Sequence, residues 1–348
     1  MTSDSTHVSW FEHVGLAQRA EVGGKGGSLG ELARAGHPVP PGFVVRTGAF
    51  EHHLAALEAE SPLRAVVETL DPDDLTALAA ASRTLRARVE GAPLPPEVEQ
   101  AVAAAHAALC QPGVAAVAVR SSATTEDAAD ASFAGLQDTY LWVRGERQVL
   151  QKVRSCWASL YSVDSISYRR RKGFPESQVA MAVVVQAMVD ARTAGVMFTR
   201  SPTTGDRSVI TIEGSWGLGS AVVSGEVTPD RWVLGKITGE ISRRDISQKL
   251  IRHVPAADGV EEQPVPEAIR GEACLSDAEL QALRGIGRAV ERHYGCPQDI
   301  EWAVDQAGLI HLLQSRPETV WAAKQAVPVA RAAEDPLRHV MTIFGGRR

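Results

Sequence analysis

The chain has 348 residues, of which 44% are hydrophobic, and a formal net charge of −6 at pH 7. At about 100–200 residues per domain, this length predicts two or three domains or lobes with a sizeable core. The mildly acidic charge argues against a general binder of nucleic acid or of membrane surfaces. The four cysteines show no C-x-x-C spacing, so neither a zinc site nor a disulfide framework is indicated. No apolar run is long enough to span a membrane, and we expect a cytoplasmic protein.

The first half of the chain predicts a helical subdomain placed between strands. Residues 47–110 are rich in Ala, Leu, Glu and Arg, with apolar residues at helical spacing and prolines that break the pattern. A strand over 114–119 would deliver Arg120, Ser121 and Ser122 to a loop. The other elements expected here are a helix over 26–36, strands over 39–45 and 139–143, and a helical stretch over 148–172.

The second half predicts mainly strands. Residues 179–189 form a nearly continuous apolar run, which is typical of a strand buried on both faces. Ser276 and Glu279 offer a capping box for a helix that runs to about Tyr294. The other elements expected are strands over 193–199, 209–213 and within 230–253, an acidic loop over 255–266, and a closing hairpin over 299–316.

The closing hairpin carries four polar side chains that we expect on one face. Alternate residues of a strand share a face, so Asp299 and Glu301 point one way while the residues between them point into a core. If residues 305–308 form the loop, Asp299 lies opposite Gln314. If only 307–308 turn, Asp299 lies opposite Arg316 and Glu301 opposite Gln314.

Either register gathers ligands suited to a metal and a phosphate. Two carboxylates and an amide oxygen are hard ligands of the kind that Mg²⁺ takes, and a guanidinium beside them suits a phosphate. The alternative is an ordinary edge hairpin with a solvated face.

Gly23 to Leu29 is a glycine-rich segment with Lys25 at its centre. Free N–H groups at the start of a helix favour an anion, and the lysine adds a positive charge. The segment does not fit the Walker A pattern. A flexible glycine turn with an exposed lysine is the alternative.

Two further segments offer contacts to phosphates. Arg120 provides a planar fork of donors, followed by serine and threonine hydroxyls. The acidic residues 126–130 argue for a solvated loop instead. Residues 133–139, which include Gly135 and Thr139, are interpreted either as a flap over phosphates or as a turn before the next strand.

The apolar run 183–189 contains one glutamine, Gln186, and ends near Met188. Such a strand can pass an adenine ring, with backbone groups at its edge and a methionine at its face, or it can be an ordinary core strand. None of the ten histidines lies in a glycine-rich loop flanked by Thr and Ser, where a phosphorylatable imidazole would be presented.

Five ordered motifs together resemble the nucleotide-binding part of phosphoenolpyruvate synthases, pyruvate phosphate dikinases and rifampicin phosphotransferases. The resemblance extends from about residue 10 to 321. The motifs are Gly23–Leu29, Val117–Ala123, Ala194–Thr199, Gly217–Gly219 with Val223–Gly225, and Asp299–Ala303 with Gln314–Pro317.

The resemblance implies an ATP-grasp fold, in which two α/β lobes close on ATP. The lobes would be residues 1–190, with the helical insert 47–110, and residues 191–321, followed by a tail over 322–348. In this family a histidine on a separate swivelling domain attacks the β-phosphorus of ATP and AMP leaves, after which the phosphohistidine phosphorylates a small molecule bound elsewhere.

The resemblance also implies roles for individual residues. Lys25 and Arg120 would hold phosphates, and Arg316 would clamp the transferring phosphoryl group. The others are Glu301, Gln314 and Asp299 at Mg²⁺, Gly135 and Thr139 on a phosphate flap, and Gln186 with Met188 in the adenine pocket.

Two departures qualify the resemblance. Members of the family often have Glu after Gly-Leu-Gly, whereas this chain has Ser220. Only 27 residues follow Trp321, too few for a histidine domain. We therefore expect the ATP-binding subunit of a split dikinase, similar to that of phenylphosphate synthases. The alternatives are a fragment of a longer enzyme and a non-catalytic nucleotide-binding module.

Overall fold

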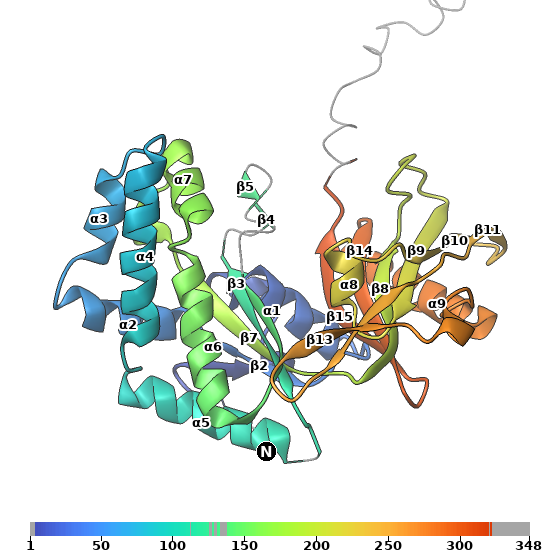
Figure 1. The fold of residues 1–348 in the computed structure, drawn as a ribbon, viewed down its shortest axis with the longest axis horizontal. Helices are drawn as coiled ribbons and strands as arrows, with labels where there is room; N and C mark the ends of the chain where they lie inside the picture. Colours follow the sequence, from blue (N-terminus) through green and yellow to red (C-terminus); the bar gives the residue numbers. More distant parts are fainter. Residues whose placement is uncertain are drawn as a thin grey trace, which may run out of the picture. The chain divides into compact units, whose positions relative to one another are not determined.

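The computed structural model describes residues 4–111, 113–124, 127–128, 131–132, 138–319 and 321. Met1–Pro317 form one compact unit and Glu318–Arg348 a second. In the second unit the N–H of Trp321 donates to Glu318 Oε1 at 2.7 Å, and the predicted tail over 322–348 lies outside the described residues. All helices and strands described below belong to the first unit (Figure 1).

The first sheet holds five antiparallel strands in the order β1-β2-β7-β3-β6. Its central strand is the apolar run predicted above, and alternate residues of that strand fill two cores. Val183 and Val185 face one core, whereas Ala182 and Val184 face the other. The strands are β1 (Val8–Trp10), β2 (Gly42–Val45), β3 (Val117–Ala123), β6 (Thr139–Val143) and β7 (Met181–Ala187).

The predicted helical subdomain is present as four helices that end near the expected prolines. They share the larger core with two later helices (Figure 1). The helical stretch expected over 148–172 is present as two helices, which are divided at residues 160–162. There the Ser162 side chain caps the second helix by accepting from the Ser165 N–H at 3.2 Å. The helices are α2 (Thr47–Glu58), α3 (Leu63–Thr69), α4 (Leu75–Gly91), α5 (Pro96–Cys110), α6 (Gly145–Ser159) and α7 (Val163–Lys172).

Helix α1 (Arg19–Arg34) covers the opposite face of the first sheet and also contacts the last strand, β15 (Ile310–Pro317). It begins earlier than the predicted start at residue 26. Gly23 interrupts it with φ 71°, so the glycine-rich segment is a kink inside the helix. The Ser28 hydroxyl donates to the Ser315 carbonyl at 2.7 Å, which fixes α1 against β15.

The second sheet holds six antiparallel strands in the order β11-β10-β9-β8-β14-β15. Helix α9 (Asp277–Tyr294) packs on one face over buried Trp232 and Trp302, and its predicted capping box at Ser276 is confirmed. The chain changes from one sheet to the other between residues 187 and 191, where the lobe boundary was placed. The remaining strands are β8 (Ala191–Phe198), β9 (Val209–Trp216), β10 (Asp230–Gly235), β11 (Ile241–Asp245) and β14 (Gln298–Asp305).

Smaller elements connect these layers. The loop predicted over 255–266 is wrong, because half of it forms β13 (Val260–Pro264), which pairs with β12 (Ile251–Pro255) as a hairpin. The polar residues of this hairpin are exposed or half-buried, so its sequence lacks a strand's apolar pattern. A short helix, α8 (Ser220–Val223), follows β9. Two-residue strands lie at Asp127–Ala128 and Ala131–Ser132, and single 3₁₀ turns at Phe11–His13, Leu16–Gln18, Glu176–Gln178 and Glu267–Ile269.

Candidate functional site

The β14–β15 hairpin adopts the register that pairs Asp299 with Arg316 and Glu301 with Gln314. It does so with a longer turn than expected, since β14 ends at Asp305 and β15 begins at Ile310. A β-bulge at Leu313 supplies the extra residue that restores the register. Ile300 and Trp302 are buried in the core, as predicted.

Arg120 extends from the middle of β3 to this hairpin. Its Nη2 atom donates to Glu301 Oε2 at 3.0 Å and to Gln314 Oε1 at 2.6 Å. Its Nη1 atom donates to the carbonyl of the bulged Leu313 at 3.0 Å. The bulge therefore positions a backbone acceptor for the guanidinium, whose side chain is only 10% exposed.

The second arginine of the set is more accessible. Arg316 Nε lies 3.4 Å from Asp299 Oδ2, and the arginine side chain is 51% exposed. It is held at one edge of the hairpin face by a single carboxylate, so its remaining donors can meet a ligand.

Two hydrogen bonds of Ser122 connect the glycine-rich segment to β3. Ser122 Oγ accepts from the Gly26 N–H at 3.1 Å and donates to the Val22 carbonyl at 2.8 Å, on either side of the kink. A Cβ at Gly23 would lie 2.0 Å from the Ser122 carbonyl oxygen, so only glycine permits this approach. The contact places Lys25 in the same pocket as Arg120.

The loop expected for Arg120, Ser121 and Ser122 is therefore wrong, because β3 continues to Ala123. Both serines are buried, and their hydroxyls donate to backbone carbonyls of Asp138 and Val22. These hydroxyls connect β3 to neighbouring segments of the fold, whereas we had predicted that they donate to phosphate oxygens.

A pocket of about 420 Å³ collects the predicted residues from both sheets and α1. Asp299 does not line the pocket but pairs with Arg316, which does, whereas Gly135 lies outside the described residues. The predicted residues that line the pocket are Lys25, Arg120, Thr139, Gln186, Met188, Glu301, Gln314 and Arg316.

The other wall of the pocket is apolar. Gln186 is buried, and its Nε2 donates to the Pro40 carbonyl at 3.5 Å. The Met188 N–H donates to the Ala116 carbonyl at 3.0 Å, so this backbone donor is already used within the fold. No pocket role was predicted for the small and apolar residues that line it, which include Ala118, Leu141, Val189, Ala191, Ala194 and Leu218.

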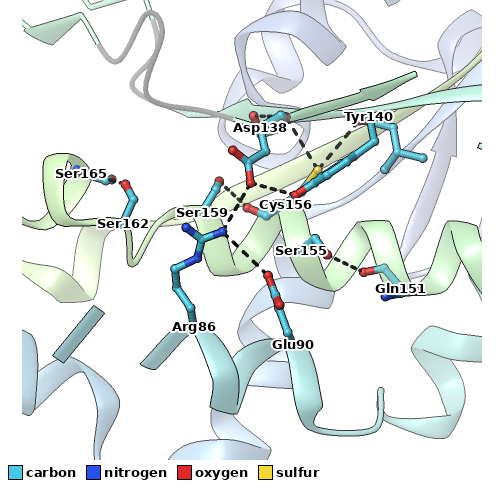
Figure 2. A network of polar contacts seen from close by, with 12 residues as sticks. Arg86, Glu90, Asp138, Tyr140, Gln151, Ser155, Cys156, Ser159, Ser162 and Ser165 are labelled. Carbon is cyan, nitrogen blue, oxygen red and sulfur yellow. Dashed lines mark hydrogen bonds and ion pairs between the residues drawn. The ribbon is translucent and has the colours of Figure 1, made fainter. Parts of the chain in front are cut away.

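Strand β6 brings Thr139 to the pocket and is anchored to the helical subdomain. Figure 2 shows the Asp138 carboxylate between the Tyr140 hydroxyl, at 2.8 Å, and Arg86 of α4, at 3.8 Å. Burial, together with the Asp138 carboxylate, raises the pKa of the Tyr140 hydroxyl. Burial likewise raises the pKa of the Cys156 thiol below it, so this cysteine remains protonated and is not a nucleophile.

Strand β6 also bulges beside the pocket. Val117 pairs with Val143 and Val119 with Tyr140, which leaves one extra residue in β6. Trp142 adopts φ 56°, an uncommon conformation for a bulky side chain. The Trp142 side chain packs with Ala194 and other residues at the apolar end of the pocket. The strained backbone of Trp142 thus lies in the wall that forms this end.

The donor set suits a hard divalent cation. Glu301 and Gln314 direct a carboxylate and an amide oxygen toward one nitrogen of Arg120, so both oxygens converge on one region of the pocket. Elsewhere among the described residues, Glu226, His253 and Glu262 form a group of possible metal ligands whose ligand atoms lie within 4.8 Å of one another.

Two findings limit the chemistry of the described residues. No histidine among them lines the pocket, although His253 contacts the lining residue Ser220 at 2.7 Å. Within the same part of the chain, no helix combines the length and apolar character needed to cross a bilayer.

Comparison with known proteins agrees with this geometry. The family model of the pyruvate phosphate dikinase AMP/ATP-binding domain matches residues 19–336. The chain is 43% identical over 316 residues to a probable phosphoenolpyruvate synthase of Methanothermobacter thermautotrophicus, which covers 90% of this chain and 46% of that protein. It is 42% identical over 336 residues to a rifampicin phosphotransferase of a Streptomyces species, with 96% and 38% covered.

A phosphoenolpyruvate synthase of Pyrococcus furiosus is 36% identical over 372 residues, which cover 94% of this chain and 45% of that protein. The chain thus spans less than half the length of these relatives. A solved structure of the D-cycloserine synthetase DcsG aligns with 84% of this chain and 62% of its own, at 14% identity and a TM-score of 0.28.

Proposed function

Because the chain belongs to the family of the pyruvate phosphate dikinase AMP/ATP-binding domain, we propose that it binds Mg·ATP and presents the β-phosphorus to a histidine on a separate domain. The chain has the ATP-grasp fold that membership implies, with two antiparallel sheets and an N-terminal helical subdomain. The observation that carries the proposal is the convergence of Arg120, Glu301 and Gln314 in one pocket with Lys25 and Arg316.

The pocket has the polarity that ATP requires. Its polar end holds three cations and two metal-ligating oxygens, which match a triphosphate and its counterion. Its apolar end, beside Met188 and Val189, offers a face for the adenine ring. ATP would therefore lie with its base near the end of β7 and its phosphates at the hairpin.

Glu301 and Gln314 would hold Mg²⁺, with Asp299 assisting. When bound, Mg²⁺ neutralises negative charge on the phosphates. Lys25 and Arg120 would hold phosphate oxygens, and Arg316, the most accessible of the three cations, would stabilise the phosphoryl group in transfer. Thr139 would line the phosphate end.

The proposed reaction needs an imidazole as its nucleophile. No histidine of the described residues lines the pocket, and its walls hold no cysteine. In our proposal an imidazole of another domain attacks the β-phosphorus, the bond to the α–β bridging oxygen breaks, and AMP departs with that oxygen. The β- and γ-phosphoryl groups move together, because the γ group remains bonded to the β group.

We place that histidine on a separate polypeptide, as in phenylphosphate synthases, with phenol as one candidate for the final acceptor. The names of the relatives support two other acceptors, pyruvate and rifampicin. With either acceptor, the histidine domain that carries the phosphoryl group would belong to the same chain. The site is the same in each case. A non-catalytic nucleotide-binding module is less favoured, because Lys25, Arg120 and Arg316 converge with Glu301 and Gln314 on one pocket.

The test combines the chain with a separately produced histidine domain and ATP labelled at the β-phosphate. We expect AMP and a labelled partner. In Glu301→Gln, partner labelling should fall by about 100-fold or more, while nucleotide binding persists in part through Lys25 and Arg120. The matched control is Glu213→Gln, since Glu213 is similarly exposed in the same sheet but pairs with Arg231 outside the pocket. Normal ATP binding without AMP in any such mixture would refute the proposal.

A further inference from the structure

Ser220 lies where two hollows meet. It follows the Gly217-Leu218-Gly219 turn at the start of α8, and it lines the nucleotide pocket. It also lines a second hollow of about 460 Å³, which shares Thr139 and Leu141 with the pocket and includes His253. The family resemblance leaves this residue without a role, because a glutamate is common at its position.

A histidine and a carboxylate hold the Ser220 side chain. Ser220 Oγ lies 2.7 Å from His253 Nδ1, and His253 Nε2 lies 3.0 Å from Glu226 Oε2. A carboxylate can only accept, so the neutral imidazole carries its proton on Nε2 and turns the Nδ1 lone pair toward the serine. The serine O–H then points at His253, which leaves the lone pairs of Oγ for another donor.

The backbone fixes this chain of contacts. The Leu218 N–H donates to the His253 carbonyl at 2.9 Å, so β12 lies directly against the turn. Gly217 has φ 80°, and a Cβ there would lie 2.4 Å from the same carbonyl oxygen. A backbone hydrogen bond therefore joins the turn that precedes Ser220 directly to His253.

The position of Ser220 along the pocket indicates what it meets. The turn packs on β8, where the nearest side-chain atom to a Cβ at Gly219 would be Ala194 Cβ, at 3.5 Å. Ala194 pairs with Ala303, whereas Glu301 at the phosphate end pairs with Val196, two residues further along β8. The turn that leads into Ser220 thus packs beside the apolar end of the pocket, and the charged end lies two residues further along β8. The ribose is the part of a nucleotide that joins those ends, and its hydroxyl groups are hydrogen-bond donors.

We propose that Ser220 Oγ accepts a hydrogen bond from a ribose hydroxyl of the bound nucleotide, and that His253 and Glu226 are the positioning residues that orient it. This inference rests on the proposed binding of ATP. It makes Ser220 a residue that distinguishes ribonucleotides from deoxyribonucleotides, because a nucleotide without that hydroxyl leaves the serine acceptor unpaired.

The experiment measures the affinity of ATP, 2′-deoxy-ATP and 3′-deoxy-ATP by calorimetry. The protein is first treated with EDTA and then given Mg²⁺ alone, because Glu226, His253 and Glu262 could hold another cation. We expect the wild-type chain to bind ATP about 10-fold more tightly than one of the two analogues. In Ser220→Ala this ratio should fall to about 1, with the affinity for that analogue nearly unchanged.

Ser224→Ala is the matched control. Ser224 also lines the pocket, but its hydroxyl contacts the Ala221 carbonyl of its own helix at 3.4 Å and not the His253–Glu226 pair that orients Ser220, so the ratio should be retained. Glu226→Ala should reduce the ratio, and Glu226→Gln should restore it, since a glutamine oxygen still accepts the Nε2 proton. A purely structural role would change all affinities equally.

The outcomes separate the two proposals. Equal affinities for all three nucleotides in the wild-type chain, or a ratio that survives in Ser220→Ala, would overturn the role of Ser220 while ATP binding stands. Failure of the wild-type chain to bind ATP would overturn the proposed function and this inference with it.

Discussion

Arg120 Nη2 lies 3.0 Å from Glu301 Oε2, and this ion pair joins the central part of one sheet to the last hairpin of the other. The same nitrogen contacts Gln314 and its neighbour contacts the Leu313 carbonyl. The guanidinium therefore links the two sheets and also lines the pocket. Its donors hold the two residues that we assign to the metal in the orientation that the site requires.

Replacing Arg120 by Lys should weaken both roles. A lysine has one nitrogen and cannot reach three acceptors in the planar geometry of a guanidinium. We expect AMP formation with a histidine domain to fall by about 100-fold and the free energy of unfolding in urea to fall by about 1–3 kcal/mol. Arg86→Lys is the control, since Arg86 makes only longer contacts of 3.8–3.9 Å. Equal effects of the two substitutions would argue against the role of Arg120.

The kink at Gly23 should tolerate no side chain. A methyl group there would meet the Ser122 carbonyl at 2.0 Å, whereas the same group at Gly36 would meet nothing within 4 Å. Both glycines have positive φ, 71° and 77°, so a side chain is disfavoured at both positions, and Gly23 also has ψ 178°, a combination that is nearly restricted to glycine. Gly23→Ala should cost several kcal/mol more and abolish ATP binding, as measured by urea unfolding and calorimetry. Similar losses for Gly23→Ala and Gly36→Ala would contradict the close approach.

The buried pair of Arg169 and Glu176 should stabilise the helical subdomain. Both side chains are almost fully buried, and two nitrogens of Arg169 contact the carboxylate at 2.9 and 3.3 Å. Arg169→Met leaves an uncompensated buried charge, so the free energy of unfolding should fall by about 3–5 kcal/mol. Arg171→Met removes an exposed partner of Asp73 and should cost less than about 1 kcal/mol. Thermal or urea unfolding of both variants measures the difference.

His53 should make the fold less stable in mild acid. Burial lowers the pKa of His53 below its usual 6.5, and the ring lies 5.3 Å from that of Trp157. As the pH falls below about 6.5, the unfolded chain binds a proton that the folded histidine resists, so stability decreases. His53→Phe should reduce the loss of unfolding free energy between about pH 7 and about pH 5. An unchanged loss in His53→Phe would exclude His53 as a source.

The periodic parts of the fold could be predicted from the sequence. The alternation around Ile300 and Trp302 indicated a half-buried strand, and the capping box at Ser276 marked the start of a helix. The extent of β3 could not be predicted, because Ser121 and Ser122 resemble loop residues until their hydroxyls meet backbone carbonyls from other elements. Such contacts depend on tertiary packing.

The candidate site was predictable in its charged residues and less so in its shape. Strand alternation and the family resemblance indicated Arg120, Glu301 and Gln314, but the bulge at Leu313 that aligns them leaves no local signal. The apolar wall around Ala194 and Leu218 comes from five separate segments, so no single pattern contains it. Ser220 was noticed only as a departure, since its partner His253 lies 33 residues away in a hairpin expected to be partly loop.

The most direct test of the central claim follows the nucleotide product. The chain is mixed with a histidine domain, Mg²⁺ and ATP labelled at the α-phosphate, and the labelled products are separated by thin-layer chromatography. The account predicts that the label appears as AMP, only when both proteins are present, and that Glu301→Gln reduces it by about 100-fold or more. Formation of ADP in place of AMP would contradict the claim that the pocket presents the β-phosphorus.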